Sequence, residues 1–398
     1  MSVCRPKGFV ASGVHCGVKA GDALDLALVA TADGKPVPAA AVFTSNKAAA
    51  APVQVSRSNL AATGGQAAAV VLNSGNANAA TGAAGRSSAE QMAAAVAAAL
   101  ECAACEVLVC STGLIGIPLP IDAVLSGAGP LVAARKGTEA AALLAAQAIM
   151  TTDTRPKETL VGTGLVTVGG MAKGAAMLAP HLAVHDAHAT QATMLAVLTT
   201  DATATPDELQ AALGRAVDAS FNTLVVDGCT STNDTVIVLA SGKMARPPAG
   251  ALAEALTLAC QDLAEQMADD AEGATRVATI RVWGARTADD ARRAARRVAE
   301  SQLVQCSLHG GDPYWGRIVS ELGSSGSDFD PDTVSVAYGG VTVCDGGVAA
   351  PHDADRVRAH LDGRMVEISA GLGLGDAETT FLMTSLSPAY IAENEKTS

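Results

Sequence analysis

Two threonines in this chain could serve as nucleophiles. Thr190 and Thr193 each follow an alanine in the stretch HATQATMLAVLTT and stand directly before an apolar run that is typical of a β-strand. A threonine that enters a strand is commonly just a β-branched residue in a favourable place. It becomes a nucleophile if the peptide bond before it is cut, because its hydroxyl and its own free α-amine then stand on one residue.

A turn at the end of another apolar strand offers the partner groups for such chemistry. In STGLIG, Thr112 and Gly113 follow the strand. A Thr-Gly turn can direct a hydroxyl and a backbone N–H at one point, which is what an oxyanion hole requires. An ordinary strand-ending turn explains the same residues, so this stretch alone leaves both interpretations open.

Further polar residues stand in apolar or glycine-rich surroundings. Thr151 lies beside Asp153 in AIMTTDTRPK, which by itself is typical of a helix-capping cluster. Lys173 stands between small residues in MAKG, where its ammonium could bind a carboxylate. Glu272 comes at a helix end in DAEG, and residues 227–235, DGCTSTNDT, form a polar stretch that a simple loop explains.

Helices and strands must position these groups. Cap residues and amphipathic patterns predict helices at 87–104, 205–221, 251–270 and 287–303. Apolar runs predict strands at 106–113, 164–170, 193–200, 223–228, 234–241, 276–284, 334–343, 365–375 and 379–386. Because helices and strands alternate irregularly, with hairpin-like pairs, we expect a layered α/β or α+β architecture and no strict βαβ repeat.

Composition excludes several classes of protein. The 398 residues are 49% apolar and 17% charged, which predicts a large core, and with 3% aromatics that core must be built from small side chains. A net charge of −13 argues against nucleic-acid and anionic-membrane partners. There is no signal-peptide pattern and no apolar run of ~20 residues. Nine scattered cysteines indicate free thiols and a cytoplasmic protein.

Taken in order, the motifs resemble the ornithine acetyltransferase family, the bifunctional enzymes of arginine biosynthesis. The resemblance covers almost the whole chain. Its carriers are VFTSNKAAAAPV, VLNSGNANAATG, CSTGLIGIPLP, AIMTTDTRPK, VGGMAKGAAMLAP, ATMLAVLTTDA, DGCTSTNDT, DAEGAT, GGDPYWGRI and LSPAYIAEN. A related subgroup, encoded in clavulanic-acid gene clusters, shares these motifs and remains an alternative.

The resemblance implies a precursor that cuts itself between Ala192 and Thr193. The Thr193 hydroxyl would attack the Ala192 carbonyl, and water would hydrolyse the resulting ester. The freed threonine would then take acetyl from N2-acetylornithine and pass it to glutamate, giving ornithine and N-acetylglutamate. Some family members also take acetyl from acetyl-CoA. No cofactor and no metal is implied.

The resemblance also assigns site residues. Thr112 and Gly113 would form the oxyanion hole. The positions that match substrate-binding residues are Thr151, Lys173, Thr193, Glu272, Asn394 and Ser398. Glu272 would pair with the ornithine ammonium and Lys173 with a substrate carboxylate.

The implied fold is a layered sandwich of mixed β-sheets between helices, N-terminal-nucleophile-like, with a smaller C-terminal domain. Residues 1–192 would become the alpha chain and 193–398 the beta chain, with the smaller subdomain starting at about residue 285. Two cleaved protomers would associate as a heterotetramer of two alpha and two beta chains.

The chain departs from the family pattern just before the predicted cut. The segment 181–191 is longer than usual by about nine residues, judged as a loop insertion. It could impair self-cleavage, and Thr190 offers a second Ala-Thr bond. On a helix, His181, His185 and His188 would share a face with zinc- or nickel-binding spacing, whereas an exposed polar loop explains them as well.

Two smaller departures affect the acceptor side. Tyr314 stands where the family commonly has asparagine, and the tail lacks a tyrosine, so that Thr397 or Ser398 would partner Asn394. Two rival functions therefore remain. One is a related acyltransferase or amidohydrolase of specialised metabolism; the other is an uncleaved binding or regulatory protein.

Overall fold

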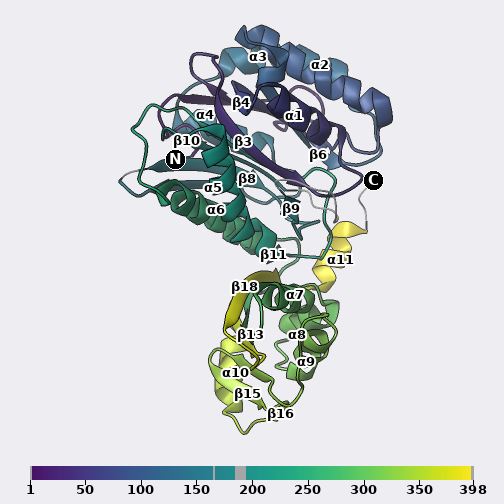
Figure 1. Ribbon diagram of the computed structural model, residues 1–398. Helices are drawn as coiled ribbons and strands as arrows, with labels where there is room; N and C mark the ends of the chain where they lie inside the picture. The colour runs from purple at the N-terminus through teal and green to yellow at the C-terminus, as the bar shows by residue number, and fades with distance from the viewer. Residues whose placement is uncertain (1, 165, 184–193, 396–398) are drawn as a thin grey trace. The chain divides into compact units, whose positions relative to one another are not determined.

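The computed structural model describes residues 2–164, 166–183 and 194–395 (Figure 1). The chain forms two compact units. The first contains Met1–Asn222 and Thr230–Met267, and the second contains Thr223–Cys229 and Ala268–Thr397. The second unit thus begins earlier than the expected residue 285, because the strand Val277–Ala285 lies inside its sheet with a neighbour on each side.

The first unit contains two sheets that bring distant parts of the chain together. The first sheet has the spatial order β1 (Phe9–Val14), β2 (Leu26–Thr31), β5 (Ala69–Asn76) and β6 (Val107–Leu114). The second has the order β4 (Gln66–Ala67), β3 (Val37–Thr44), β12 (Thr235–Ala240), β10 (Leu195–Thr200), β8 (Thr167–Lys173) and β7 (Lys157–Gly162), with β9 (Leu182–Ala183) beside β3. Both sheets mix parallel and antiparallel neighbours.

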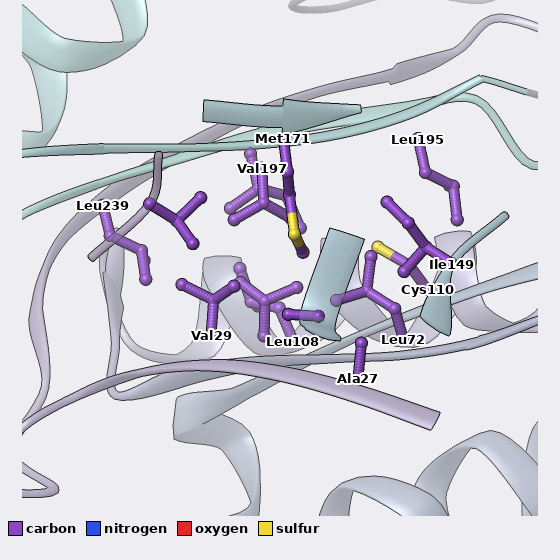
Figure 2. Packing of buried hydrophobic residues seen from close by; sticks show 14 of the residues in the cluster. Ala27, Val29, Leu72, Leu108, Cys110, Ile149, Met171, Leu195, Val197 and Leu239 are labelled. Atoms are coloured by element: carbon purple, nitrogen blue, oxygen red, sulfur yellow. The ribbon is translucent and has the colours of Figure 1, made fainter. Parts of the chain in front are cut away.

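The two sheets pack face to face. Figure 2 shows Val29 and Leu72 of the first sheet directed toward Met171 and Val197 of the second. These side chains are completely buried, and alanines fill much of the remaining space. The small side chains of the sequence therefore form a closely packed sandwich core.

Helices cover the outer faces of the sandwich. The helices packed on the outer face of the first sheet are α1 (Ala51–Ala62), α2 (Gly82–Leu100) and α3 (Ile121–Ala134). The helix α4 (Glu139–Ala148) packs on β1 and β2 and contributes its buried alanines to the core cluster between the two sheets. On the second sheet, α5 (Pro206–Asp218) packs on β3, and α6 (Ala251–Asp269) places Leu263 near Gly170 of β8. Thr205 is the N-cap of α5, as the sequence predicted, and it forms a capping box with Glu208. The expected layers are confirmed.

The second unit has its own mixed sheet. Its spatial order is β11 (Leu224–Val225), β18 (Ala377–Thr384), β13 (Val277–Ala285), β17 (Met365–Gly371), β14 (Ser335–Tyr338), β15 (Val341–Asp345) and β16 (Val348–Ala349). Its helices are α7 (Ala288–Ala299), α8 (Gln302–Gly310), α9 (Trp315–Gly323), α10 (Ala354–Leu361) and α11 (Pro388–Asn394). Of the strand predicted at 223–228, only Leu224–Val225 forms a strand in the structure. Within the described ranges, no helix has the length and apolarity needed to cross a membrane.

Candidate active site

The predicted oxyanion turn lies at the end of β6, which pairs in parallel with β5. Thr112 is completely buried. Gly113 has a φ of +130°, and a Cβ atom there would lie 2.3 Å from the carbonyl carbon of Gly75. No other residue fits this close approach of two strands without a shift of the backbone. A glycine is therefore required beside Thr112, as the sequence motif has it.

Lys173 connects this turn to the second sheet. It is the last residue of β8, and its Nζ atom donates a hydrogen bond of 3.3 Å to the Thr112 hydroxyl. The side chain is almost fully buried. Lys173 also lies opposite Leu195, the first residue of β10, in the antiparallel β8–β10 register. The structure thus brings two predicted site residues together at the start of the strand that follows the predicted cut.

A buried carboxylate holds Lys173 and Thr151 in place. Asp153 accepts hydrogen bonds from Lys157 Nζ at 2.6 Å, from the Gly174 backbone N–H at 2.7 Å and from the Thr151 backbone N–H at 3.0 Å. Its Oδ2 atom also lies 4.0 Å from Lys173 Nζ. The sequence suggested only a capping cluster here, so this role of Asp153 and Lys157 was missed.

The charges around Asp153 determine its ionisation. Burial alone would raise the pKa of the Asp153 carboxyl, but the charges of Lys173 and Lys157 and the hydrogen bonds that it accepts lower this pKa to about 2. The carboxylate is therefore ionised at neutral pH. It fixes the two lysines and the backbone beside Thr151.

Lys19, which lies between β1 and β2 in the chain, binds the backbone next to Thr151. Its Nζ atom donates hydrogen bonds to the backbone carbonyls of Leu24 at 2.9 Å and Met150 at 2.7 Å. Met150 directly precedes Thr151, which is half-buried. Burial is the main cause that lowers the pKa of the Lys19 ammonium. Nothing in the sequence around Lys19 indicated this role, because both carbonyls are backbone groups.

Glu272 and Asn394 meet in the second unit. The Asn394 side-chain amide donates a hydrogen bond of 2.7 Å to Glu272 Oε2 and another of 2.9 Å to the Tyr390 carbonyl. The backbone beside Glu272 is tightly packed, since a Cβ atom on Gly273 would lie 2.3 Å from the Tyr390 nitrogen. The sequence motifs DAEGAT and LSPAYIAEN, far apart in the chain, thus form one polar cluster.

Several predicted residues lie outside the described residues. They are Ala192 and Thr193 of the predicted cut, the alternative Thr190, the histidines His185 and His188, and Thr397 and Ser398 of the tail. His181 is described and exposed, and its carbonyl accepts a hydrogen bond of 2.8 Å from Ser45. In the part of the chain that is described, no three metal-ligating side chains cluster. The metal hypothesis for 181–191 therefore stays a prediction.

Tyr314, the departure from asparagine, begins α9 without a side-chain hydrogen bond to the helix. Its ring lies 5.7 Å from the Arg317 guanidinium. The substitution therefore replaces a residue type that favours helix N-caps by an exposed ring that contacts a cation.

Comparison with known proteins identifies the family. A family model described as the ArgJ family matches residues 10–397. The arginine biosynthesis bifunctional protein ArgJ of Thermobifida fusca (strain YX) is 46% identical over 397 residues, which is 99% of each chain. The protein of the same name from Mycobacterium tuberculosis (strain ATCC 25618 / H37Rv) is 47% identical over 399 residues, covering 98% of this chain and 95% of its own.

A solved structure also matches in sequence. The crystal structure of ornithine acetyltransferase complexed with ornithine from Mycobacterium tuberculosis aligns with 49% sequence identity and a TM-score of 0.44, covering 46% of this chain and 96% of that chain. The sequence matches over nearly the full length decide the assignment. This chain is an enzyme of the ArgJ family.

Proposed function

We propose that this protein is a self-cleaving N-acetyltransferase that moves acetyl from N2-acetylornithine to glutamate through an acetyl-threonine intermediate on Thr193. The relatives named above are bifunctional proteins of arginine biosynthesis, which supports this reaction class. The observation that carries the proposal is the contact between Lys173 and Thr112 at the start of β10. This contact supports the proposal because the turn at Thr112 then lies near the start of β10, whose first residue, Leu195, comes two positions after Thr193 in the sequence.

The proposed cut needs only groups of the chain and one water molecule. The Thr193 hydroxyl attacks the Ala192 carbonyl carbon, its proton passes to the departing Thr193 nitrogen, and the Ala192–Thr193 C–N bond breaks as an ester forms. Water then hydrolyses the ester: its oxygen bonds to the Ala192 carbonyl carbon as the C–O bond to Thr193 breaks, one water proton goes to the Thr193 oxygen, and the other passes to the new α-amine, which leaves a carboxylate on Ala192. Donors at Thr112 and Gly113 would stabilise the oxyanion in both steps.

Transfer repeats this chemistry on the substrate. The free α-amine of Thr193, which ordinarily titrates near ~7.7–8, would act as the general base. The Thr193 oxygen takes the acetyl group while ornithine leaves with the proton, and the glutamate amine then removes the acetyl group. Splitting one transfer into two acyl steps gives ping-pong kinetics.

The polar clusters suit charged amino-acid substrates. The buried Glu272 carboxylate, oriented by the Asn394 amide, would bind the ornithine ammonium. Lys173, fixed by Asp153, would bind a substrate carboxylate. We expect no cofactor, and we expect two cleaved protomers to associate; the use of acetyl-CoA as a second acetyl donor, known for some family members, is left open.

A transfer assay tests this proposal. Purified protein is incubated with N2-acetylornithine and isotope-labelled glutamate, and labelled N-acetylglutamate and free acetate are quantified. We expect transfer with little free acetate. Thr193→Ala should abolish transfer, and Thr112→Ala should lower kcat by a factor on the order of 10²–10³.

Thr190→Ala is the matched control and should behave like the unchanged chain. Full transfer by Thr193→Ala would overturn the proposal. If Thr190→Ala alone loses activity, the nucleophile is Thr190. Acetate as the main product would favour an amidohydrolase of specialised metabolism.

A further inference from the structure

Lys19 lies next to the oxyanion turn, as Lys173 does, but reaches it through a different strand. The Lys19 stem packs on Gly75 of β5, where a Cβ atom would lie 2.8 Å from Lys19 Cγ. Gly75 stands opposite Gly113 in the parallel β5–β6 register. Lys173 reaches the same turn from β8, through its hydrogen bond to Thr112. Two lysines from distant parts of the chain therefore lie next to this turn.

One peptide group connects the same two lysines. The Lys19 ammonium donates a hydrogen bond of 2.7 Å to the Met150 carbonyl, which belongs to the peptide group between Met150 and Thr151. The N–H of that peptide group donates one of 3.0 Å to Asp153, which lies 4.0 Å from the Lys173 ammonium. The backbone at Thr151 is thus held on its carbonyl side by Lys19 and on its N–H side by the carboxylate that fixes Lys173.

A buried carboxylate fixes the loop from which Lys19 projects. Asp25 accepts hydrogen bonds from four consecutive backbone N–H groups, at 2.6 Å from Cys16, 3.1 Å from Gly17, 2.7 Å from Val18 and 2.9 Å from Lys19. Burial alone would raise the pKa of the Asp25 carboxyl, but these hydrogen bonds lower it below its usual value. The loop is therefore held by an ionised group, and Lys19 is positioned before any ligand binds.

The charged groups around Thr151 carry an excess of positive charge. The groups that the contacts above connect are the ammonium groups of Lys19, Lys157 and Lys173 and the carboxylates of Asp25 and Asp153. Three positive charges against two negative ones leave one positive charge among these described groups. Burial raises the pKa of Asp234, a further carboxyl that Lys173 influences, well above its usual range, so that Asp234 offsets less of this charge.

The two ammonium groups also repel each other. Burial is the main cause that lowers the pKa of Lys19, and the charge of Lys173 acts in the same direction. An anion that contacts both ammonium groups would relieve this repulsion. The arrangement therefore suits one carboxylate beside the oxyanion turn.

The proposed substrates carry a carboxylate at the required place. N2-acetylornithine and glutamate both have the reacting nitrogen on the carbon atom that bears the α-carboxylate, so two bonds separate this nitrogen from the carboxyl carbon. When the acetyl carbonyl lies at Thr112 and Gly113, the α-carboxylate must lie within roughly 5 Å of that carbonyl. The donor and the acceptor share this group, whereas their side chains end in opposite charges.

We propose that Lys19 is a second binding residue for the substrate α-carboxylate and acts together with Lys173. This inference rests on the proposed function. A lysine ammonium has three donors, so Lys19 can bind a carboxylate oxygen while it keeps its hydrogen bonds to the Met150 and Leu24 carbonyls. The two lysines would then make the enzyme select N-acetyl amino acids over N-acetyl amines.

Two acetyl donors that differ only in this carboxylate test the proposal. N-acetylputrescine is N2-acetylornithine without its α-carboxylate, so the ratio of kcat/KM for N2-acetylornithine to kcat/KM for N-acetylputrescine measures what this group contributes. The ratio is determined with labelled glutamate as acceptor for the unchanged chain, Lys19→Met and Lys19→Arg. Methionine keeps an unbranched stem on Gly75 but removes the ammonium.

Lys7→Met is the matched control. Lys7 is exposed, and its ammonium donates a hydrogen bond of 3.4 Å to Met244 Sδ. Its backbone N–H binds Asp201, which directly follows β10 at the end of that strand remote from Leu195 and Lys173. The control therefore removes a lysine charge from the same unit but away from Thr151.

We expect Lys19→Met to lower kcat/KM for N2-acetylornithine about 10- to 100-fold, through a higher KM, and to change kcat/KM for N-acetylputrescine little. Lys19→Arg should regain part of the ratio because it keeps a cation. Lys7→Met should match the unchanged chain. If Lys19→Met lowers both values equally, or neither, the inference is overturned while the proposed function stands. If the unchanged chain transfers no acetyl from N2-acetylornithine, the proposed function has failed.

Lys19→Gln covers the case in which Lys19→Met does not fold. The glutamine amide offers two N–H donors to the Met150 and Leu24 carbonyls but carries no charge. A lower ratio in Lys19→Gln, with N-acetylputrescine still used as by the unchanged chain, supports the contact with the α-carboxylate. A ratio equal to that of the unchanged chain overturns it.

Discussion

Asp153 and Asp234 are buried carboxyl groups that both interact with the same lysine, Lys173, and they differ in their other partners. Asp153 accepts three hydrogen bonds and lies near two lysines, and its pKa falls to about 2. Asp234 accepts one backbone hydrogen bond through its side chain, and its pKa rises well above the usual range. Burial acts in the same direction on both groups.

The comparison shows that partners, and not depth, decide which carboxyl is ionised. A carboxylate with a full set of donors is a fixed part of the scaffold and can hold Lys173 and Thr151 at any physiological pH. The Asp234 side chain is instead held through Oδ1 alone, because its Oδ2 atom has no hydrogen-bond partner among the described residues.

The largest effect on stability should come from removing a charged partner of Asp153. Lys157→Met removes a buried ammonium 2.6 Å from Asp153 and leaves the carboxylate short of a partner. We expect a loss of about 3–5 kcal/mol in the free energy of unfolding, measured by urea denaturation. Arg246→Met, which breaks a half-exposed pair with Glu208, is the control and should change stability little. Equal losses in the two variants would contradict the account of Asp153.

The contributions of Asp153 and Asp234 to the free energy of unfolding should change with pH in opposite directions. In an uncut Thr193→Ala background, the lowered pKa of Asp153 stabilises the fold above about pH 4, by about 2–3 kcal/mol, and this contribution disappears as the pH falls toward 2. The raised pKa of Asp234 destabilises the fold increasingly as the pH rises above about 4.

Unfolding titrations from pH 2 to pH 8 on the uncut chain measure this difference. The stability loss in Asp153→Asn should grow with pH, whereas Asp234→Asn should become relatively more stable as the pH rises. If both variants follow the same slope, burial and not partner number controls these groups.

The smallest effect should come from a cap remote from either carboxyl. Thr205 accepts a hydrogen bond from the Glu208 N–H at the start of α5. Thr205→Ala should cost about 1 kcal/mol of stability, measured by thermal or urea unfolding. The pH profile of acetyl transfer should stay that of the unchanged chain. A shift of that profile would show that a loss of stability alone changes the pH dependence of transfer.

Local patterns predicted much of the fold. The capping box of α5, the strand that ends at the Thr112 turn and the layered arrangement follow from residue types a few positions apart, which is the range in which periodicity and caps act. The second unit's start was placed too late, because a boundary depends on which strands pair and not on local composition.

The carboxyl network of the site could not be predicted in this way. From the sequence alone, Asp153 looks like a capping residue. In the structure, β8 brings Lys173 and Gly174, about twenty positions further along the chain, beside its carboxylate. From the sequence alone, Asp234 looks like part of a polar loop. In the structure, the pairing of β10 with β12 brings it to Met194, forty residues earlier in the chain. The burial of a charged group is set by such long-range pairing, which no short motif records.

Intact-mass analysis of the purified chain, beside its Thr193→Ala variant, tests the central claim most directly. The account predicts two fragments of roughly half the full mass, with residue 193 at the new N-terminus, and a single 39.6 kDa species for the variant. An unchanged chain that remains one 39.6 kDa species yet transfers acetyl to glutamate at full rate would contradict it.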